Sequence, residues 1–281
     1  MSRPDSCGSD DTGGRSPAEN AQLALLLEVA GTPKPGNVDR YRDLADLRFD
    51  HFLAGAVGAR NGLERAAEGE AVGAAFERAV AGMSTQRGGN TQFGCLLLLV
   101  PLIKAAANGS VTPVGVGSVV ESTTVEDAVD FYRAFEHVDV AVGDPPSEAD
   151  ELDVRRGSDA AETLRRRSLT LYDVMALSAD PDDRIGDGNA REWVSGFERT
   201  FQAADALLAD EGPVGDRTAC VFLELLAEQP DTLVAITHDE ATAREVSERA
   251  AAVDGDLAAA EELADEFVDA GYNPGTTADI T

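Results

Sequence analysis

Apolar residues recur every three or four positions along most of the chain, a spacing typical of helices that bury one face. The first such stretch begins after Ser16, where Pro17 takes the first helical position and Glu19 stands three residues beyond Ser16. A serine and a glutamate at this distance satisfy free amide groups of the first helical turn. The sequence therefore predicts a helix that begins after Ser16 and ends at 31–33, a Gly-Thr-Pro segment.

The same spacing predicts helices over most of the remaining chain. They cover about 46–68, 70–82, 91–107, a stretch after the cap residue Thr124, 159–179, 189–211, 216–228, 239–253 and 256–270. Gly55 and Gly58 lie near the apolar face of the second helix, where another helix can approach closely. Pro101 stands inside the strongly apolar helix 91–107 and is expected to kink it.

Few segments depart from the helical pattern. Residues 1–15 are rich in Ser, Gly and Asp and are expected to be disordered, and 137–158 reads as a long acidic loop. Only 111–120 and 138–142 have strand-like composition, and each is equally consistent with a loop. No repeat or flexible linker divides the helices. The pattern therefore predicts an all-α fold, with 16–281 as one domain and a ligand site formed by the loops between helices.

The charge balance excludes some classes of function. The chain has 281 residues, with 52 acidic and 23 basic side chains and a formal net charge of -29. Such a surface repels phosphate backbones and anionic lipid, so we expect neither nucleic acid nor a membrane as partner. Only Lys34 and Lys104 are lysines; the other cations are arginines. An acid-rich, lysine-poor surface indicates adaptation to high salt, which screens its self-repulsion.

Cysteine and histidine are sparse. Three of each are scattered along the chain without a C-x-x-C pair, which argues against a disulfide framework or a zinc site. The N-terminus lacks the apolar stretch of a signal peptide, and the longest apolar run, 95–103, is about half the length of a bilayer span. We therefore expect a soluble, cytoplasmic protein.

Candidate chemistry lies in three loops, of which the first is 33–40, Pro-Lys-Pro-Gly-Asn-Val-Asp-Arg. Its prolines stiffen the loop, and Gly36 permits a turn that other residues resist. One interpretation is a site for a phosphorylated ligand, in which Lys34 and Arg40 meet phosphate and Asp39 binds Mg²⁺. The alternative is a turn between helices with a surface ion pair.

The second loop, 87–94, has two glycines before Asn90 and Thr91 and leads into the apolar helix. Such glycines let backbone amides converge on an anion, although Asn90 or Thr91 could simply cap the helix. The loop is not a Walker motif, because it lacks the Gly-Lys-Ser/Thr ending. The third loop, 273–279, reads as a Pro-Gly turn and a helix start, with too little chain after it to complete a helix.

Together the three loops resemble the triphosphoribosyl-dephospho-CoA synthase family. The motifs P-K-P-G-N-V-D-R, G-N-T-Q-F-G and N-P-G-T-T-A-D occur in the family's order and spacing over 18–281, and the chain is most similar to the archaeal branch. The resemblance implies a helical enzyme that joins ATP to 3′-dephospho-CoA and releases adenine. Two segments differ: the family's His-x-Asp-Met is Leu-Ala-Asp-Leu at 44–47, and a His and a Lys are Gln and Phe at 92–93.

The resemblance also implies roles for individual residues. Asp39 and Asp46 would stabilise an oxocarbenium-like transition state or accept the hydroxyl proton, and either could instead bind the Mg²⁺ expected with ATP. The residues implied in nucleotide or phosphate binding are Lys34, Gly36, Asn37, Arg40, Gly89, Asn90 and Thr91. Two alternatives remain: another ATP-using enzyme of cofactor biosynthesis, such as a phosphoryl transferase, or a non-catalytic nucleotide-binding protein.

Five further features receive a structural or secondary interpretation. The cluster 165–167 of three arginines fits a solvated helix face better than a site for CoA phosphates. His51 is interpreted as structural and Cys95 as a small core residue. Asp173 is a lesser site candidate, and Glu192 is expected to line the cavity or cap a neighbouring helix.

Overall fold

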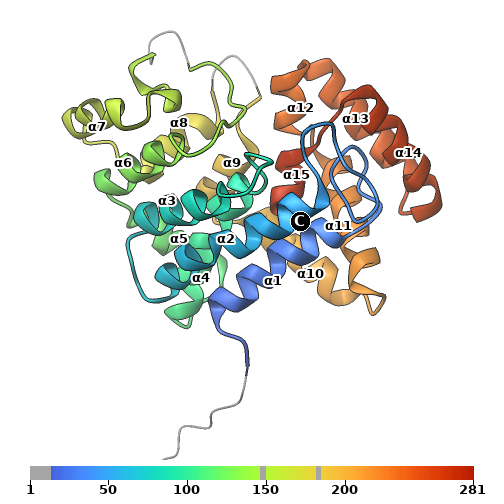
Figure 1. Ribbon diagram of the computed structural model, residues 1–281, viewed down its shortest axis with the longest axis horizontal. Coiled ribbons are helices and arrows are strands. Elements are labelled where there is room, and N and C mark those ends of the chain that lie inside the picture. Colours follow the sequence, from blue (N-terminus) through green and yellow to red (C-terminus); the bar gives the residue numbers. More distant parts are fainter. Residues whose placement is uncertain (1–13, 146–149, 182–184) are drawn as a thin grey trace, which may run out of the picture.

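The computed structural model describes residues 14–145, 150–181 and 185–281, and within these ranges every regular element is a helix (Figure 1). The all-α prediction is therefore confirmed. In chain order the helices are α1 (Pro17–Ala30), α2 (Phe49–Ala67), α3 (Val72–Met83), α4 (Phe93–Ala107), α5 (Pro113–Glu121), α6 (Val125–Ala134), the short 3₁₀ turns η1 (Asp150–Leu152) and η2 (Val154–Ala160), α7 (Ala161–Arg167), α8 (Leu171–Ala179), α9 (Gly188–Ser195), α10 (Glu198–Ala209), α11 (Val214–Glu228), α12 (Thr232–Thr237), α13 (Glu240–Val253), α14 (Leu257–Ala270) and α15 (Gly275–Ile280).

The first helix begins and ends where its local sequence predicts. The Ser16 hydroxyl accepts a hydrogen bond from the Glu19 amide at 3.2 Å, and the Glu19 carboxylate accepts one from the Ser16 amide at 2.8 Å. The next two helices, α2 and α3, cross at closely packed glycines. A Cβ at Gly58 would lie 2.2 Å from the carbonyl oxygen of Gly82, so only glycine allows this approach.

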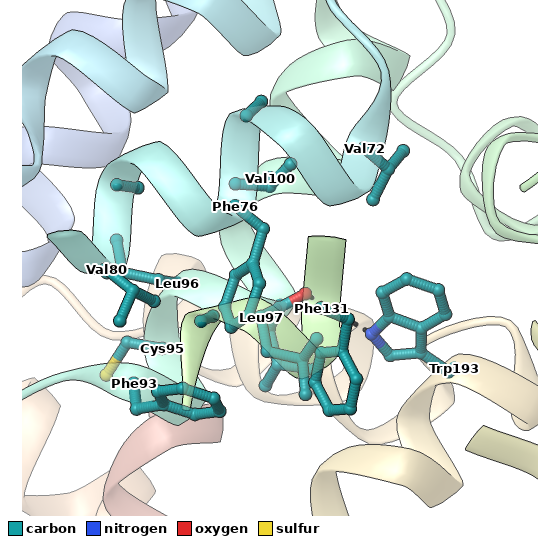
Figure 2. Packing of buried hydrophobic residues seen from close by; sticks show 14 of the residues in the cluster. Val72, Phe76, Val80, Phe93, Cys95, Leu96, Leu97, Val100, Phe131 and Trp193 are labelled. Atoms are coloured by element: carbon teal, nitrogen blue, oxygen red, sulfur yellow. Dashed lines mark hydrogen bonds between the residues drawn. The ribbon is translucent and has the colours of Figure 1, made fainter. Parts of the chain in front are cut away.

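Helix α4 is the centre of the fold. It contacts α1, α2, α3, α5, α9 and α15. The apolar run that predicted a buried helix is buried: Leu96 and Val100 have no exposed surface. Figure 2 shows this packing, including Trp193 from α9, whose indole N–H donates to the carbonyl oxygen of Leu97 at 3.2 Å.

A second group of helices, α11 to α14, packs around a smaller apolar cluster that includes Phe222 and Phe267. In Figure 1, α6 to α8 lie on one side of the molecule and α12 to α14 on the other, with α15 between them. Helix α15 contacts α4 and α9 as well as α11 and α12. The last helix therefore connects the two groups, and its residues lie where they meet.

Several boundaries differ from the predictions. Segment 111–120, read as a strand or a loop, contains most of α5, whose first turn is capped by the Thr112 hydroxyl. The helices predicted at 159–179 and 189–211 are each interrupted, because Ser168 and Phe197 adopt left-handed backbone conformations with φ of 54° and 64°. The long helix α4 continues through Pro101.

Besides α5, two short helices were not predicted. They are α12, and α15 at the position of the third loop. The chain after Pro274 was expected to be too short for a helix, yet 275–280 forms one. The predicted acidic loop contains η1 and η2, while its residues 146–149 lie outside the described ranges, as do residues 1–13 of the predicted tail. Within the described residues, no helix is long and apolar enough to cross a bilayer.

Candidate functional site

The three loops singled out in the sequence meet in space. Asn37 Nδ2 in the first loop donates to Asn273 Oδ1 in the third at 2.9 Å, a contact between residues 236 positions apart. The backbone amide of Cys95, one residue past the second loop, donates to Asp279 Oδ1 in the third at 2.9 Å. Segments from the two ends and the middle of the sequence are thus joined by direct hydrogen bonds.

These loops border a cavity of about 580 Å³. Its lining includes polar side chains from five segments: Glu28, Asn37, Thr91, Asn189 and Asp279. It also includes apolar side chains, among them Phe131, Phe135, Val140, Val142 and Leu152. A volume of several hundred Å³ with few converging polar groups is typical of small-molecule sites. The cavity is therefore the candidate functional site.

Asp279 lies half-buried in the wall of this cavity. Its Oδ1 accepts the Cys95 amide and the Cys95 thiol (Sγ to Oδ1 3.2 Å), and its Oδ2 accepts Asn189 Nδ2 at 2.9 Å. Gly94 leaves the room for this carboxylate, because a Cβ there would lie 1.9 Å from Oδ2. Desolvation raises the pKa of Asp279 to about 7. The group therefore changes its charge near neutral pH.

Glu28, at the end of α1, supplies a second carboxylate to the cavity wall. It forms a buried ion pair with Lys34, whose Nζ also donates to Asn37 Oδ1 at 3.1 Å. Burial raises the pKa of Glu28, while the adjacent ammonium group opposes this shift. Lys34 has no exposed surface and is not among the cavity-lining residues. Its contacts hold Glu28 in place.

Comparison with known proteins identifies the family. The CitG family, described as ATP:dephospho-CoA triphosphoribosyl transferase, matches residues 14–281. The chain belongs to this family. The resemblance seen in the three motifs is confirmed, and family membership assigns the protein to the transferases.

One solved structure extends the comparison with the CitG family. A crystal structure of a candidate triphosphoribosyl-dephospho-CoA synthase from Archaeoglobus fulgidus has 26% sequence identity and a TM-score of 0.63 to this chain. The match covers 83% of this chain and 94% of the archaeal protein. No curated protein sequence matches the chain.

Asp39, the first acid of the family's motif, is buried but does not line the cavity. Its Oδ1 accepts the amides of Tyr41 and Arg42 at 2.8 and 2.9 Å. Its Oδ2 accepts the Thr32 hydroxyl, the Lys34 amide and Arg42 Nη1 at 2.9–3.2 Å. With two or three donors on each oxygen, this carboxylate does not fit the predicted role of a Mg²⁺ ligand. It organises the first loop.

Asp46 and Arg40 also lie outside the cavity wall. Both are exposed, and Asp46 precedes α2, which begins at Phe49 rather than near Asp46 as the sequence predicted. The expected convergence of Asp39 and Asp46 beneath the Asn90–Thr91 turn is therefore not found: neither acid lines the cavity that the turn borders.

The remaining motif residues shape the two loops. Gly36 has a φ of +77°, and a Cβ there would lie 2.2 Å from the carbonyl oxygen of Tyr272, so the position requires glycine. Gly89 also has a positive φ of 68°. Asn90 lines the cavity and caps α4, since its Oδ1 accepts the Phe93 amide at 3.1 Å. The contact of Asn90 with the start of α4 is therefore found, and binding of an anion by this loop stays a prediction.

The secondary candidates have structural contacts. The arginines of 165–167 are half-exposed and pair with Glu126 or Glu151, as expected of a solvated face, although Arg167 also borders the cavity. His51 Nδ1 accepts the Arg48 amide at 3.3 Å. Asp173 forms a capping box with Thr170 at the start of α8. Glu192 caps α10 by accepting the amide and hydroxyl of Thr200.

The cavity residues that sequence reasoning missed include Glu28, Asn189 and Asp279. Asp279 ends the third motif, so its position in that motif was an available signal. Glu28 lies in the regular pattern of α1, and Asn189 lies in the first turn of α9 after a mixed polar segment, so neither stands out locally. Cys95 was read as a core residue; it is buried and also lines the cavity.

Proposed function

We propose that this protein transfers the triphosphoribosyl group of ATP to a ribose hydroxyl of 3′-dephospho-CoA and releases adenine. The observation that carries the proposal is the convergence of the three family motifs on one cavity, through the contacts of Asn37 with Asn273 and of Cys95 with Asp279. These residues are far apart in sequence, and the fold brings them together at the cavity.

The cavity has the chemistry that this displacement needs. Breaking the bond between adenine and C1 of the ATP ribose creates positive charge on the sugar, which a nearby carboxylate stabilises. Glu28 is suited to that role, because Lys34 favours its ionised form although the site is buried. The apolar part of the lining, which includes Phe131 and Phe135, offers aromatic and aliphatic surface for an adenine ring or a pantetheine arm.

We expect Mg²⁺ to enter with the triphosphate as part of the substrate. Within the described ranges, no group of three or more His, Cys, Asp or Glu side chains is arranged to hold a metal ion. The donor set of Asp39 is occupied by amides, a hydroxyl and Arg42, so that residue offers no preformed site. Phosphate oxygens and water would then supply most of the ion's ligands.

We place the reaction in the cytoplasm, where ATP is available, and in a medium of high ionic strength. The formal net charge of -29 implies strong self-repulsion at low salt. The same charge opposes the approach of two anionic substrates, and high salt weakens this repulsion. Assays therefore belong in molar KCl.

The test is incubation with ATP, Mg²⁺ and dephospho-CoA in molar KCl, followed by chromatography for free adenine. Adenine that appears only when dephospho-CoA is present supports the proposed transfer. ADP or AMP without adenine would identify a phosphoryl or nucleotidyl transferase instead. Bound but unchanged ATP would identify a non-catalytic nucleotide-binding protein.

A further inference from the structure

Two residues of the cavity wall each have a buried polar atom with no hydrogen-bond partner among the described residues. The atoms are Asn189 Oδ1 and Thr91 Oγ1, and both are inaccessible to bulk solvent. Asn189 as a whole is only 7% exposed. Buried polar atoms are nearly always hydrogen-bonded, because an unmade bond costs about 1–3 kcal/mol. Unpaired acceptors in a cavity wall therefore indicate a ligand with hydroxyl or amino groups.

Asn189 also holds the carboxylate next to it. Its Nδ2 donates to Asp279 Oδ2 at 2.9 Å, which leaves Oδ2 with capacity for a further donor. The two residues therefore place a carboxylate and a carboxamide next to each other in the cavity wall. This pair matches two neighbouring hydroxyls, as on the ribose of a nucleotide without a 3′-phosphate.

The other buried carboxylates are already committed. Asp39 and Asp231 accept several protein donors each and do not line the cavity, and Glu192 caps α10. Glu28 is paired with Lys34. Asp279 lines the cavity and accepts hydrogen bonds from neutral groups: the Cys95 amide, the Cys95 thiol and Asn189. It is therefore well placed to take up a proton.

We infer that Asp279 accepts the proton of the attacking hydroxyl and that Asn189 positions both Asp279 and the neighbouring hydroxyl of the acceptor's ribose. The inference rests on the proposed function and names the acceptor's vicinal diol as the group recognised. Cys95 is a second positioning residue, because its amide and thiol fix Asp279 Oδ1.

The hydroxyl oxygen forms a bond to C1 of the ATP ribose while the bond from C1 to the adenine nitrogen breaks. The electron pair of that bond leaves with adenine, and the hydroxyl proton passes to Asp279 Oδ2. The proton then moves from Asp279 to the departing adenine, directly or through water, so that neutral adenine leaves and the carboxylate is regenerated.

The surroundings of Asp279 suit a proton that is taken up and returned. Desolvation, together with the negative charges of Glu28 and Asp231, raises the pKa of Asp279 to about 7, while the donors Asn189 and Cys95 lower it. A proton acceptor is most effective when its pKa lies near the working pH. Activity should therefore rise with pH and level off above about pH 7.

The first test replaces Asp279 with Asn, which keeps the shape of the side chain but cannot accept a proton. The turnover number for adenine release should fall about 10²- to 10⁴-fold, while the KM for ATP stays within about threefold of the parent value. A thermal melt checks that the variant is folded. Asn189→Ala provides a second variant, whose KM for dephospho-CoA should rise about tenfold with little change in the KM for ATP.

The positioning role of Cys95 is tested against a matched control. Cys95→Ala removes a donor that lowers the pKa of Asp279, so the acidic limb of the pH profile should move to higher pH. Cys220→Ala changes the same residue type on α11, outside the cavity, and should leave the profile in place. A merely structural role for Cys95 would change stability without moving the limb.

The outcomes separate this inference from the proposed function. If the parent protein releases no adenine with dephospho-CoA, both are overturned. If the parent is active and Asp279→Asn retains turnover within about threefold, only the inference is overturned. Equal increases in the KM for both substrates in Asn189→Ala would contradict the assignment of the diol to the acceptor.

Discussion

Lys34 is the residue whose expected behaviour changes most once the fold is known. As an exposed loop lysine it would bind phosphate, and its removal would weaken ATP binding far more than it affects stability. The structure places it out of solvent, with its ammonium group against Glu28 and Asn37. Replacing it with Met, which has a similar length, leaves the Glu28 carboxylate buried without its cation.

The expected loss can be estimated from this geometry. Removing one partner of a buried ion pair costs about 3–5 kcal/mol, because the remaining charge stays desolvated. For a chain of this size each kcal/mol lowers the melting temperature by about 2–3 °C, so Lys34→Met should melt about 6–15 °C below the parent. The neutral pair Glu28→Gln with Lys34→Met should recover most of that loss, because no buried charge remains.

The assay is thermal unfolding of the parent, both single variants and the double variant in molar KCl. Lys104→Met is the matched control, since it removes the chain's other lysine. Lys104 is partly exposed and donates to the backbone carbonyls of Gly69 and Glu70, so its loss should cost about 1 kcal/mol or less. If Lys34→Met melts within 2 °C of the parent, its loss of stability is only about one kcal/mol, and the buried-pair argument is refuted. A tenfold weaker ATP affinity in such a variant would restore the phosphate-binding interpretation.

Four further predictions follow from the site and the charge. Gly94→Ala should cost about 1–3 kcal/mol and displace Asp279, lowering both melting temperature and adenine release, whereas Gly117→Ala, where a Cβ meets nothing within 4 Å, should change neither by much. Asp39→Asn should destabilise by about 2–3 kcal/mol because it weakens charged hydrogen bonds, while exposed Asp46→Asn should stay within about 0.5 kcal/mol and keep its activity; full stability of Asp39→Asn would count against its role in the loop. Asp279 has its folded pKa raised above the ordinary value near 4, so its contribution to stability is complete below about pH 4 and is lost as pH rises through about 7. Relative to Asp279→Asn, the parent should therefore lose melting temperature over that range, and a constant difference would contradict the shifted pKa. Lowering KCl from molar to low millimolar should lower the parent's melting temperature, and an unchanged value would refute the adaptation to high salt.

Features determined by neighbouring residues were predictable from sequence. The start of α1 depends on Ser16 and Glu19, which bond to each other's backbone within one helical turn, so a segment of four residues contains the whole signal. The close approach of α2 and α3 was likewise indicated by Gly58 on an otherwise apolar face. The three loops of the site were found because each motif is local, and their order along the chain carries the family resemblance.

Features determined by contacts between distant residues were not predictable from sequence. The polar sequence around Lys34 indicated an exposed side chain. Nothing local shows that Lys34 forms a buried ion pair with Glu28 on the preceding helix. Helix α15 seemed too short to form, but Asp231 accepts the amide and hydroxyl of Thr277 at 2.7 Å and ties its first turn to the body of the protein. The left-handed conformation of Phe197, which separates α9 from α10, has no local signal either, since non-glycine residues rarely adopt it.

The expected convergence of Asp39 and Asp46 at the cavity was wrong for the same physical reason. Asp39 matches the family's motif, but its neighbours in the loop supply enough donors to occupy both oxygens. The cavity lining includes Glu28 and Asp279, which come from opposite ends of the chain. Only the fold shows that they share one site.

The most direct test of the proposed transfer follows the two halves of ATP separately. ATP labelled with one isotope in its ribose and another in its adenine is incubated with dephospho-CoA, Mg²⁺ and the protein in molar KCl, and the products are separated. The account predicts equal amounts of free labelled adenine and of a dephospho-CoA product that carries the ribose label and all three phosphates. Both labels remaining together, in ADP, AMP or intact ATP, would contradict it.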